Sequence, residues 1–198
     1  HPDFRPRAWM DELPPLDAFG TLVFQVAGQQ LSVASTRAII RHLEEQFGGH
    51  MPSAAELLAA DPQVLRASGF SARKGATLRE LAERFVDGRL SDRALAAMTD
   101  DEVEATLTEV PGIGPWTARG FLLVALDRPD VFLSGDLALR RAIQRAYGFD
   151  HLPTDDEVAA ARELVARRGA REPLAYVLGE WGFRRLTLRT DRRALVPR

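Results

Sequence analysis

The feature that most constrains the fold is a helix-start signal that occurs three times. In this signal a Ser or Thr is followed three residues later by a Glu, so that each side chain can bond to the backbone amide of the other. It occurs at residues 53–56, 99–102 and 154–157, and apolar residues at helical spacing follow each copy. No stretch alternates apolar and polar residues for long enough to predict a strand. We therefore expect an all-α fold of about nine or ten helices.

Composition narrows the class of protein further. The chain has 198 residues, 45% of them hydrophobic, which is enough to bury a core in one domain or in two closely packed lobes. It contains no cysteine, which excludes disulfides, cysteine-ligated zinc, iron–sulfur clusters and thiol catalysis. No apolar run reaches the roughly 18–20 residues that a membrane span requires. We expect a soluble, cytoplasmic protein that makes no contact with a membrane.

The charge balance leaves the partner open. There are 26 basic and 28 acidic residues, a net charge of −2, which argues against a strongly electrostatic nucleic-acid binder. All of the basic residues except Lys74 are Arg, which suits phosphate binding and stacking on bases. A codon bias toward GC-rich DNA would also produce this excess of Arg.

The most informative segment is Pro-Gly-Ile-Gly-Pro-Trp at residues 111–116. It follows a predicted helix that starts after Thr99, and it precedes an apolar helix over about residues 116–126. Glycines permit a tight turn and a close approach of the backbone, and Pro115 suits the first position of the second helix. The amides at such a helix start can bind a phosphate. The alternative is an ordinary helical hairpin punctuated by Gly and Pro.

Four segments in the same order resemble the helix-hairpin-helix (HhH-GPD) DNA glycosylase superfamily. They are Val-Ala-Gly-Gln-Gln-Leu-Ser-Val-Ala at 26–34, Gly-Phe-Ser-Ala-Arg-Lys from residue 69, the hairpin at 108–118, and residues 130–141. The last segment contains Asp136. The resemblance as a whole covers about residues 20–185. Within the superfamily, the chain is most similar to the alkylpurine (3-methyladenine) DNA glycosylase II group, in a minimal form without that group's N-terminal β-domain.

The resemblance implies a single glycosylase unit over residues 1–198, made of two helical lobes with the active site in the cleft between them. One lobe comprises about residues 30–134 and contains the helix-hairpin-helix at 101–126. Residues 1–29 and 135–198 together would form the other lobe.

The resemblance assigns catalysis to Asp136. A carboxylate there can stabilise an oxocarbenium-like sugar and orient or deprotonate the attacking water. The purely structural alternative is that Asp136 caps the following helix, and one residue can do both. Trp116 stands where bifunctional members carry a Schiff-base lysine, and Lys74 lies in another motif. The enzyme is therefore expected to be monofunctional, without lyase activity.

The base pocket is expected to be walled by aromatic residues. The electron-rich face of Trp116 would attract cationic 3-methyladenine and 7-methylguanine. Trp181 resembles the family's C-terminal pocket aromatic, and Phe24 and Tyr176 are further candidates, with core packing as the alternative reading. The family often has an aromatic where this chain has Gly120. That difference predicts a roomier pocket, open to bulkier lesions such as ethenoadenine.

DNA contacts follow from the same resemblance. Backbone amides around the hairpin would hold a phosphate, and carbonyls just before and within it would coordinate a monovalent cation, Na⁺ or K⁺, as a structural ion. No other cofactor is expected. The phosphate-binding residues are Gly112, Gly114, Trp116 and Thr117, and the cation ligands are Thr108, Val110 and Ile113.

A wedge that fills the gap left by a flipped base is expected at Gln30 or Leu31. Wedges are usually apolar, so Leu31 would share the task with the polar Gln30. Several basic residues are candidates for a face that contacts DNA, with a solvated helix surface as the alternative for each. They are Arg73, Lys74, Arg119, Arg140 and Arg141.

The sequence thus predicts a monomeric base-excision-repair glycosylase that acts on double-stranded DNA containing alkylated bases. The alternative is a helix-hairpin-helix protein that binds damaged DNA without catalysis, and a helical protein-interaction module is a third reading. A metal hydrolase has little support, because the four histidines are scattered and form no metal-binding motif.

Overall fold

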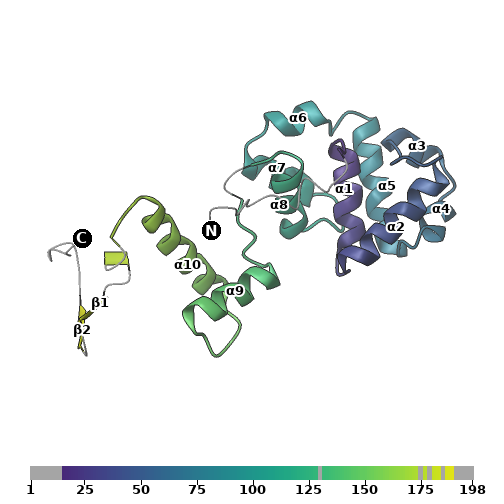
Figure 1. Ribbon diagram of the computed structural model, residues 1–198. Helices are drawn as coiled ribbons and strands as arrows, with labels where there is room; N and C mark the ends of the chain where they lie inside the picture. Colours follow the sequence, from purple (N-terminus) through teal and green to yellow (C-terminus); the bar gives the residue numbers. More distant parts are fainter. Residues whose placement is uncertain (1–14, 129–130, 174–175, 178–179, 184–185, 190–198) are drawn as a thin grey trace. The chain divides into compact units, whose positions relative to one another are not determined.

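The computed structural model describes residues 15–128, 131–173, 176–177, 180–183 and 186–189 (Figure 1). The chain divides into two compact units, His1–Phe132 and Leu133–Arg198. Within the described residues, no helix is both long enough and apolar enough to span a membrane.

The first unit contains eight helices within the described residues. They are α1 (Ala18–Gly28), α2 (Val33–Gln46), α3 (Ala54–Ala59), α4 (Gln63–Ala67), α5 (Ala72–Val86), α6 (Asp92–Ala97), α7 (Asp100–Thr108) and α8 (Pro115–Val124).

Within its described residues, the second unit contains two helices and one pair of strands. The helices are α9 (Leu137–Tyr147) and α10 (Asp155–Gly169), and the strands are β1 (Glu180–Phe183) and β2 (Leu186–Arg189). The strands pair antiparallel, with Trp181 opposite Leu188. The expected helical fold is confirmed, and the two short strands are an addition that the sequence did not predict. Strands of four residues are too short for apolar and polar residues to show a clear alternation.

All three predicted helix starts are confirmed. Ser53, Thr99 and Thr154 cap α3, α7 and α10, and in each case the Glu three residues later bonds back to the capping residue's amide. These hydrogen bonds satisfy amides that have no partner within the helix itself.

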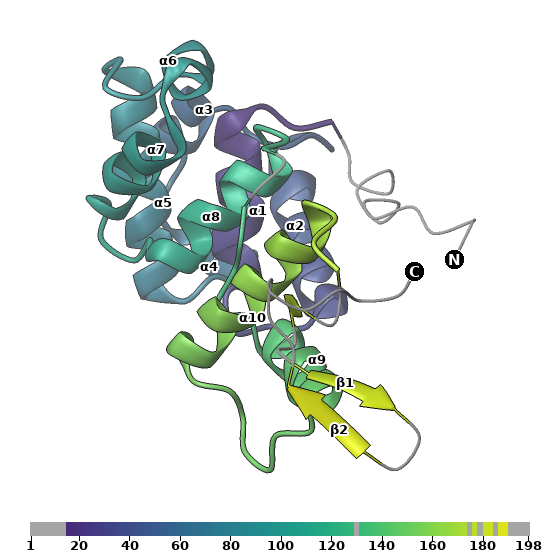
Figure 2. The ribbon, with the colours of Figure 1, turned by 90° about the vertical axis from the view of Figure 1, so that its left-hand side faces the viewer.

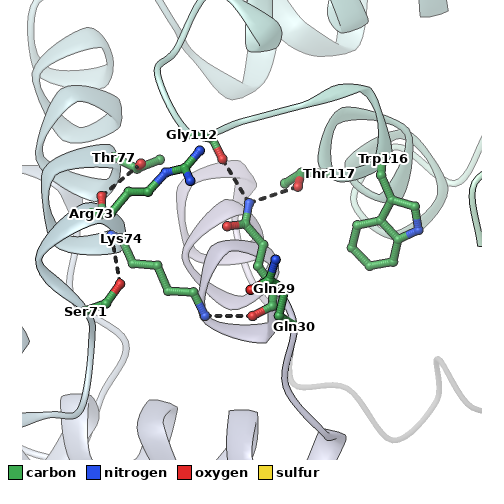
Figure 3. Close-up of a pocket in the computed structure, with 9 residues that line it drawn as sticks. All are labelled: Gln29, Gln30, Ser71, Arg73, Lys74, Thr77, Gly112, Trp116 and Thr117. Carbon is green, nitrogen blue, oxygen red and sulfur yellow. Dashed lines mark hydrogen bonds between the residues drawn. The ribbon is translucent and has the colours of Figure 1, made fainter.

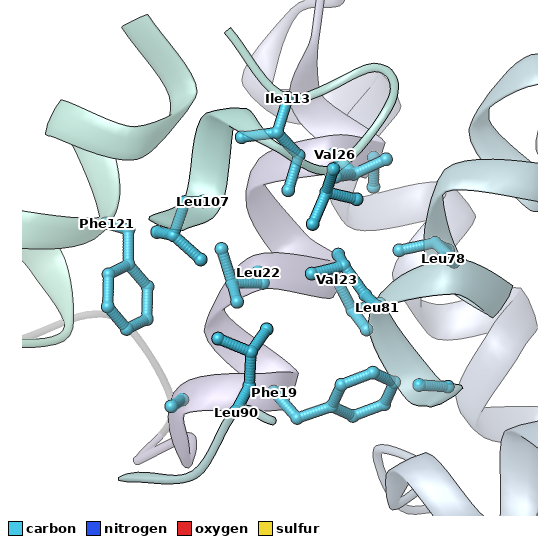
Figure 4. Close-up of a cluster of buried hydrophobic side chains, with 14 of the residues drawn as sticks. Phe19, Leu22, Val23, Val26, Leu78, Leu81, Leu90, Leu107, Ile113 and Phe121 are labelled. Carbon is cyan, nitrogen blue, oxygen red and sulfur yellow. The ribbon is translucent and has the colours of Figure 1, made fainter. Parts of the chain in front are cut away.

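The core of the first unit is built around α1. Three of its side chains, Leu22, Val23 and Val26, are fully buried (Figure 4). The helix packs against α2, α5 and α8, as Figures 1 and 2 also show. Since neighbours cover several of its faces, α1 is apolar over most of its surface. Its C-terminal end is thereby held beside the start of α5 and the turn that precedes α8.

The unit boundary after Phe132 lies close to the expected lobe boundary at about residue 134. The described part of the N-terminal segment, including α1, packs within the first unit. The pairing of residues 1–29 with residues 135–198 stays a prediction.

Candidate functional site

A cavity of about 440 Å³ lies in the first unit where three of the four motif segments meet. The end of α1, the start of α5 and the hairpin before α8 form its walls (Figure 3). Its lining residues are Gln29, Gln30, Ser71, Arg73, Lys74, Thr77, Gly112, Trp116 and Thr117. Six of these nine are residues that the sequence analysis singled out for contact with DNA or the base.

Gln29 ties the end of α1 to the hairpin. Its side-chain Nε2 donates hydrogen bonds to the Gly112 carbonyl and to the Thr117 hydroxyl, both at 3.0 Å. This role of Gln29 was not predicted, although the residue belongs to the Gln-Gln motif at 29–30. Which of two adjacent glutamines faces inward depends on the turn that follows α1, and the motif does not reveal it.

Residues 28–31 form a tight turn between α1 and α2, here called the α1–α2 turn. Gln29 has φ −54° and ψ 123°, Gln30 has φ +60°, and the Leu31 amide donates to the Gly28 carbonyl at 3.1 Å. These angles are those of a type II turn, whose third position favours glycine. Gln30 therefore carries backbone strain of the kind found at functional sites. Both wedge candidates are exposed, as a wedge requires.

Lys74 faces the protein rather than solvent. Its ammonium donates to the carbonyls of Ala27 and Gln29, at 2.8 and 2.9 Å. Partial burial lowers the pKa of Lys74 from its ordinary value by desolvating the ammonium. The neighbouring Arg73 is exposed and lines the same cavity. Direct contact of either residue with DNA stays a prediction.

The hairpin turn is locked onto α5. Gly112 has φ +96°, and a β-carbon there would overlap the hydroxyl of Thr77. That hydroxyl donates to the Pro111 carbonyl at 2.7 Å. Because both the backbone angle and the space exclude a side chain, this position requires glycine.

The start of α8 presents its amides without a side-chain cap. Gly114 occupies the N-cap position, Pro115 is the first helical residue, and no side chain caps the helix within the described residues. Gly114 and Trp116 are exposed. Thr117 is buried and its hydroxyl accepts the hydrogen bond from Gln29, so its predicted DNA contact would come from its backbone amide. Uncapped amides at a helix start suit a bound anion.

In the second unit, Asp136 is the N-cap of α9. Its Oδ1 accepts a hydrogen bond from the Leu139 amide at 2.9 Å, and the side chain is half-buried. The structural reading of Asp136 is therefore confirmed. Within the described residues, no hydrogen bond is recorded to its second carboxylate oxygen, Oδ2, and the catalytic role stays a prediction.

Comparison with known proteins decides the family. Residues 23–167 match the family model described as HhH-GPD superfamily base excision DNA repair protein. The chain belongs to the HhH-GPD superfamily. The match covers all four motif segments, including the one that contains Asp136, so the predicted resemblance is confirmed.

Two curated relatives of this HhH-GPD protein are DNA-3-methyladenine glycosylases. Glycosylase 1 of Schizosaccharomyces pombe is 30% identical over 166 residues, which is 83% of this chain and 72% of the relative. Glycosylase 2 of Escherichia coli is 30% identical over 64% of this chain. The chain spans about half, 47%, of the length of this Escherichia coli relative.

Solved structures agree with this family. The Schizosaccharomyces pombe 3-methyladenine DNA glycosylase in complex with abasic DNA has a TM-score of 0.74 and 29% identity, covering 85% of this chain and 82% of that one. The 3-methyladenine DNA glycosylase from Archaeoglobus fulgidus has a TM-score of 0.65 and 26% identity, covering 79% and 54%.

The space beside Gly120, which the sequence analysis expected to be open, is occupied, and a roomier base pocket stays a prediction. Gly120 is buried, and a β-carbon there would lie 2.9 Å from Oε1 and 3.2 Å from Nε2 of Gln25 on α1. The carboxamide of Gln25 thus occupies the space directly beside Gly120. Gln25 could not be linked to Gly120 from the sequence, because the two residues are far apart along the chain.

The remaining base-pocket candidates have different surroundings. Phe24 is half-buried and packs against the core of the first unit, as its alternative reading supposed. Tyr176 is half-buried, and its carbonyl accepts a hydrogen bond from Arg167 at 2.9 Å. Trp181 lies in β1, and its side chain is outside the described residues. Their roles in base binding stay predictions.

Two arginines of the predicted basic face form ion pairs with acidic residues of the protein itself. Arg119 forms a two-pronged ion pair with Glu104, with its Nε 2.7 Å from Oε2. Arg140 donates from Nε to the Ser134 carbonyl at 2.9 Å and pairs with Asp155. Arg141, by contrast, is exposed. Their predicted contacts with DNA are untested.

The cation expected at the hairpin is also untested. The Val110 carbonyl accepts a hydrogen bond from the Ile113 amide at 3.0 Å. The Thr108 hydroxyl turns back to the Glu104 carbonyl at 2.7 Å, which leaves the hydroxyl engaged within α7. In the described part of the chain, no group of three or more acidic, His or Cys side chains is arranged to hold a metal ion.

Proposed function

We propose that this protein is a monofunctional DNA glycosylase that flips alkylated purines out of double-stranded DNA and hydrolyses their N-glycosidic bond. The proposed substrates are 3-methyladenine and 7-methylguanine. The observation that carries the proposal is the cavity where the α1–α2 turn meets the hairpin and Trp116. Relatives that share this fold carry the name 3-methyladenine glycosylase.

The hairpin is the proposed grip on the DNA backbone. Exposed Gly114 and the uncapped start of α8 offer amide donors to one phosphate. Such a contact positions the duplex without reading its sequence. Flipping a base out of the stack costs roughly a few kcal/mol, and less at a damaged pair. Gln30 and Leu31, exposed at the α1–α2 turn, would fill the gap.

Asp136 is the proposed catalytic carboxylate. While its Oδ1 accepts the Leu139 amide, Oδ2 can face the reacting sugar. The bond between C1′ and the base nitrogen breaks, and its electron pair leaves with the cationic base, which becomes neutral. Water then forms the new bond at C1′ and loses its proton to the carboxylate. Trp116 would stack on the cationic base, a contact worth roughly 1–3 kcal/mol.

The lone lysine supports hydrolysis rather than a lyase reaction. Lys74 is the only lysine of the chain, and its ammonium is bound to two backbone carbonyls. A Schiff-base step needs an amine that is free to attack C1′.

The proposed enzyme requires no organic cofactor, and the absence of cysteine excludes a cysteine-ligated iron–sulfur cluster. A monovalent cation at the carbonyls of Thr108, Val110 and Ile113 would stabilise the hairpin. We further propose that the enzyme is a monomer in the cytoplasm, acting on the nucleoid of a bacterial cell.

The test is single-turnover base release from methylated duplex DNA by the wild type and by Asp136→Asn. Asn is as good an N-cap as Asp, so this substitution removes the charge while keeping the cap of α9. Asp17→Asn is the matched control, because Asp17 caps α1 in the same way, with Oδ1 2.7 Å from the Gly20 amide. We expect wild type and Asp17→Asn to release free methylated purine without strand cleavage before alkali, and Asp136→Asn to lose most of this activity.

Other results would change the proposal in distinct ways. Equal release by all three proteins would remove Asp136 from the chemistry and keep the function. If the folded wild type releases nothing, including from ethenoadenine and hypoxanthine substrates, yet binds damaged DNA, the protein is a non-catalytic damage-binding relative.

A further inference from the structure

The ammonium of Lys74 donates hydrogen bonds to two backbone carbonyls at the C-terminal end of α1. The Ala27 carbonyl belongs to the last turn of α1, and the carbonyls of a last turn receive no hydrogen bond from an amide of the same helix. The Gln29 carbonyl belongs to the central peptide of the α1–α2 turn. An ammonium has three donors on one compact group, so it can satisfy both carbonyls at once. Its charge also suits the negative end of the helix dipole.

The bond to Gln29 selects one form of the turn. Type I and type II turns differ by a rotation of about 180° of their central peptide, which here joins Gln29 to Gln30. In the type I form the carbonyl of Gln29 would face away from Lys74. The observed angles at Gln29 and Gln30 are those of type II. Lys74 thus holds the central peptide in the orientation that forces Gln30 to φ +60°.

Without this bond, the other form of the turn would suit glutamine better. A type I turn places its third residue at a negative φ, which a residue with a β-carbon adopts without strain. Strained backbone persists only where its surroundings determine it. The side chain of Gln29 donates hydrogen bonds to Gly112 and Thr117, and these bonds fix the same turn relative to the hairpin.

We propose that Lys74 is a positioning residue that holds the α1–α2 turn in the form that presents Gln30 to DNA at a set place beside the phosphate-binding hairpin. This inference rests on the proposed function, in which Gln30 helps to fill the gap left by the flipped base. Lys74 itself touches neither the base nor the sugar in this scheme. It acts through the backbone of Gln29.

The first experiment measures the turn in the DNA-free protein and does not depend on activity. Two nuclear Overhauser contacts are recorded by NMR for wild type and Lys74→Met: the contact between the Gln29 α proton and the Gln30 amide, which is strong in a type II turn, and the contact between the amide and α protons of Gln30, which is strong at positive φ. We expect both contacts to weaken in Lys74→Met, because a type I turn rotates the central peptide and returns Gln30 to a negative φ. Arg93→Met, which removes an exposed positive charge on α6, is the control and leaves both signals unchanged. An unchanged turn in Lys74→Met would overturn the proposal.

The second experiment is a double-mutant cycle on single-turnover base release and on DNA affinity. We expect Lys74→Met and Gln30→Ala each to slow base release by about tenfold, since small misplacements of positioning groups have effects of this order. The double variant should release the base at most about twofold more slowly than Gln30→Ala does, because Lys74 acts through Gln30. DNA affinity of Lys74→Met should match that of Arg93→Met.

The outcomes separate this inference from the proposed function. If the double variant releases the base about a hundredfold more slowly than wild type, the two losses are independent. That result would overturn the positioning role even if the enzyme is a glycosylase. If the wild type releases no base, the proposed function fails, and the NMR result alone decides whether Lys74 sets the turn. Should Lys74→Met fail to fold, Lys74→Gln, with a stem too short to reach both carbonyls, replaces it in both experiments.

Discussion

The hydroxyl of Thr77 occupies the place that a side chain on Gly112 would need. One residue lies on α5 and the other in the turn before α8, so this contact seats the hairpin on the helix. The hydroxyl also donates a hydrogen bond to the Pro111 carbonyl, so it contacts two neighbouring residues of the turn. The hairpin is therefore held by packing and hydrogen bonding that exist before DNA arrives.

Substituting Gly112 should weaken the fold and not only the contact with DNA. We expect Gly112→Ala to lower the free energy of unfolding by at least about 2 kcal/mol, since it combines strain at positive φ with overlap on Thr77. Urea unfolding measures the effect. The control is Gly114→Ala, where a β-carbon meets nothing within 4 Å, and we expect it to lose less than about 1 kcal/mol. Equal losses in the two variants would refute the packing argument.

Gln25 and Gly120 should behave as a coupled pair. Gly120→Ala forces the carboxamide of Gln25 to move, because the new β-carbon would lie 2.9 Å from Oε1. Replacing Gln25 by Ala first removes that obstacle. We expect the loss of unfolding free energy caused by Gly120→Ala to be smaller in the Gln25→Ala background, with a coupling of about 0.5 kcal/mol or more. Strict additivity in the four-protein unfolding cycle would show that the two side chains do not share this space.

The α3 capping box should make the fold sensitive to acid. Hydrogen bonds from the Ser53 hydroxyl and amide, and then from His50, lower the pKa of Glu56 from 4.5 to about 2. Because the pKa is lower in the folded state, the contribution of Glu56 to stability is present above about pH 4.5 and is lost as the pH falls toward 2. The stability difference between wild type and Glu56→Gln should therefore shrink over this range in urea unfolding. An NMR titration of Ser53→Ala should show the pKa of Glu56 moving back up.

The opposite pH dependence is expected at His151 in the second unit. Hydrogen bonds to Asp150 and then to Glu157 raise the pKa of His151 above 6.5. The contribution of this raised pKa to stability is complete below about pH 6.5 and is lost as the pH rises through the folded-state pKa. We expect His151→Gln to destabilise the protein more at about pH 5.5 than at about pH 9. An effect that is the same at both values would mean that the imidazolium pairs are absent in solution.

The sequence by itself determined the helical class, three helix starts and the family. Each capping box involves residues three positions apart, such as Ser53 and Glu56, so its geometry follows from the local chain. The motif at residues 111–116 likewise indicated the hairpin before α8, because glycine and proline have strong local preferences. The short strands β1 and β2 were not predicted, since four residues carry too little periodicity.

Only the tertiary structure decided which way the individual site residues face. Lys74 looked like a surface cation, but packing of α5 against α1 brings its ammonium to the carbonyls of Ala27 and Gln29. Gly120 suggested open space, but the contact between α8 and α1 places Gln25 there. Local preferences depend on neighbours along the chain, whereas these contacts join residues far apart in the sequence. They form only when helices pack, and a single sequence does not record which side chains packing brings together.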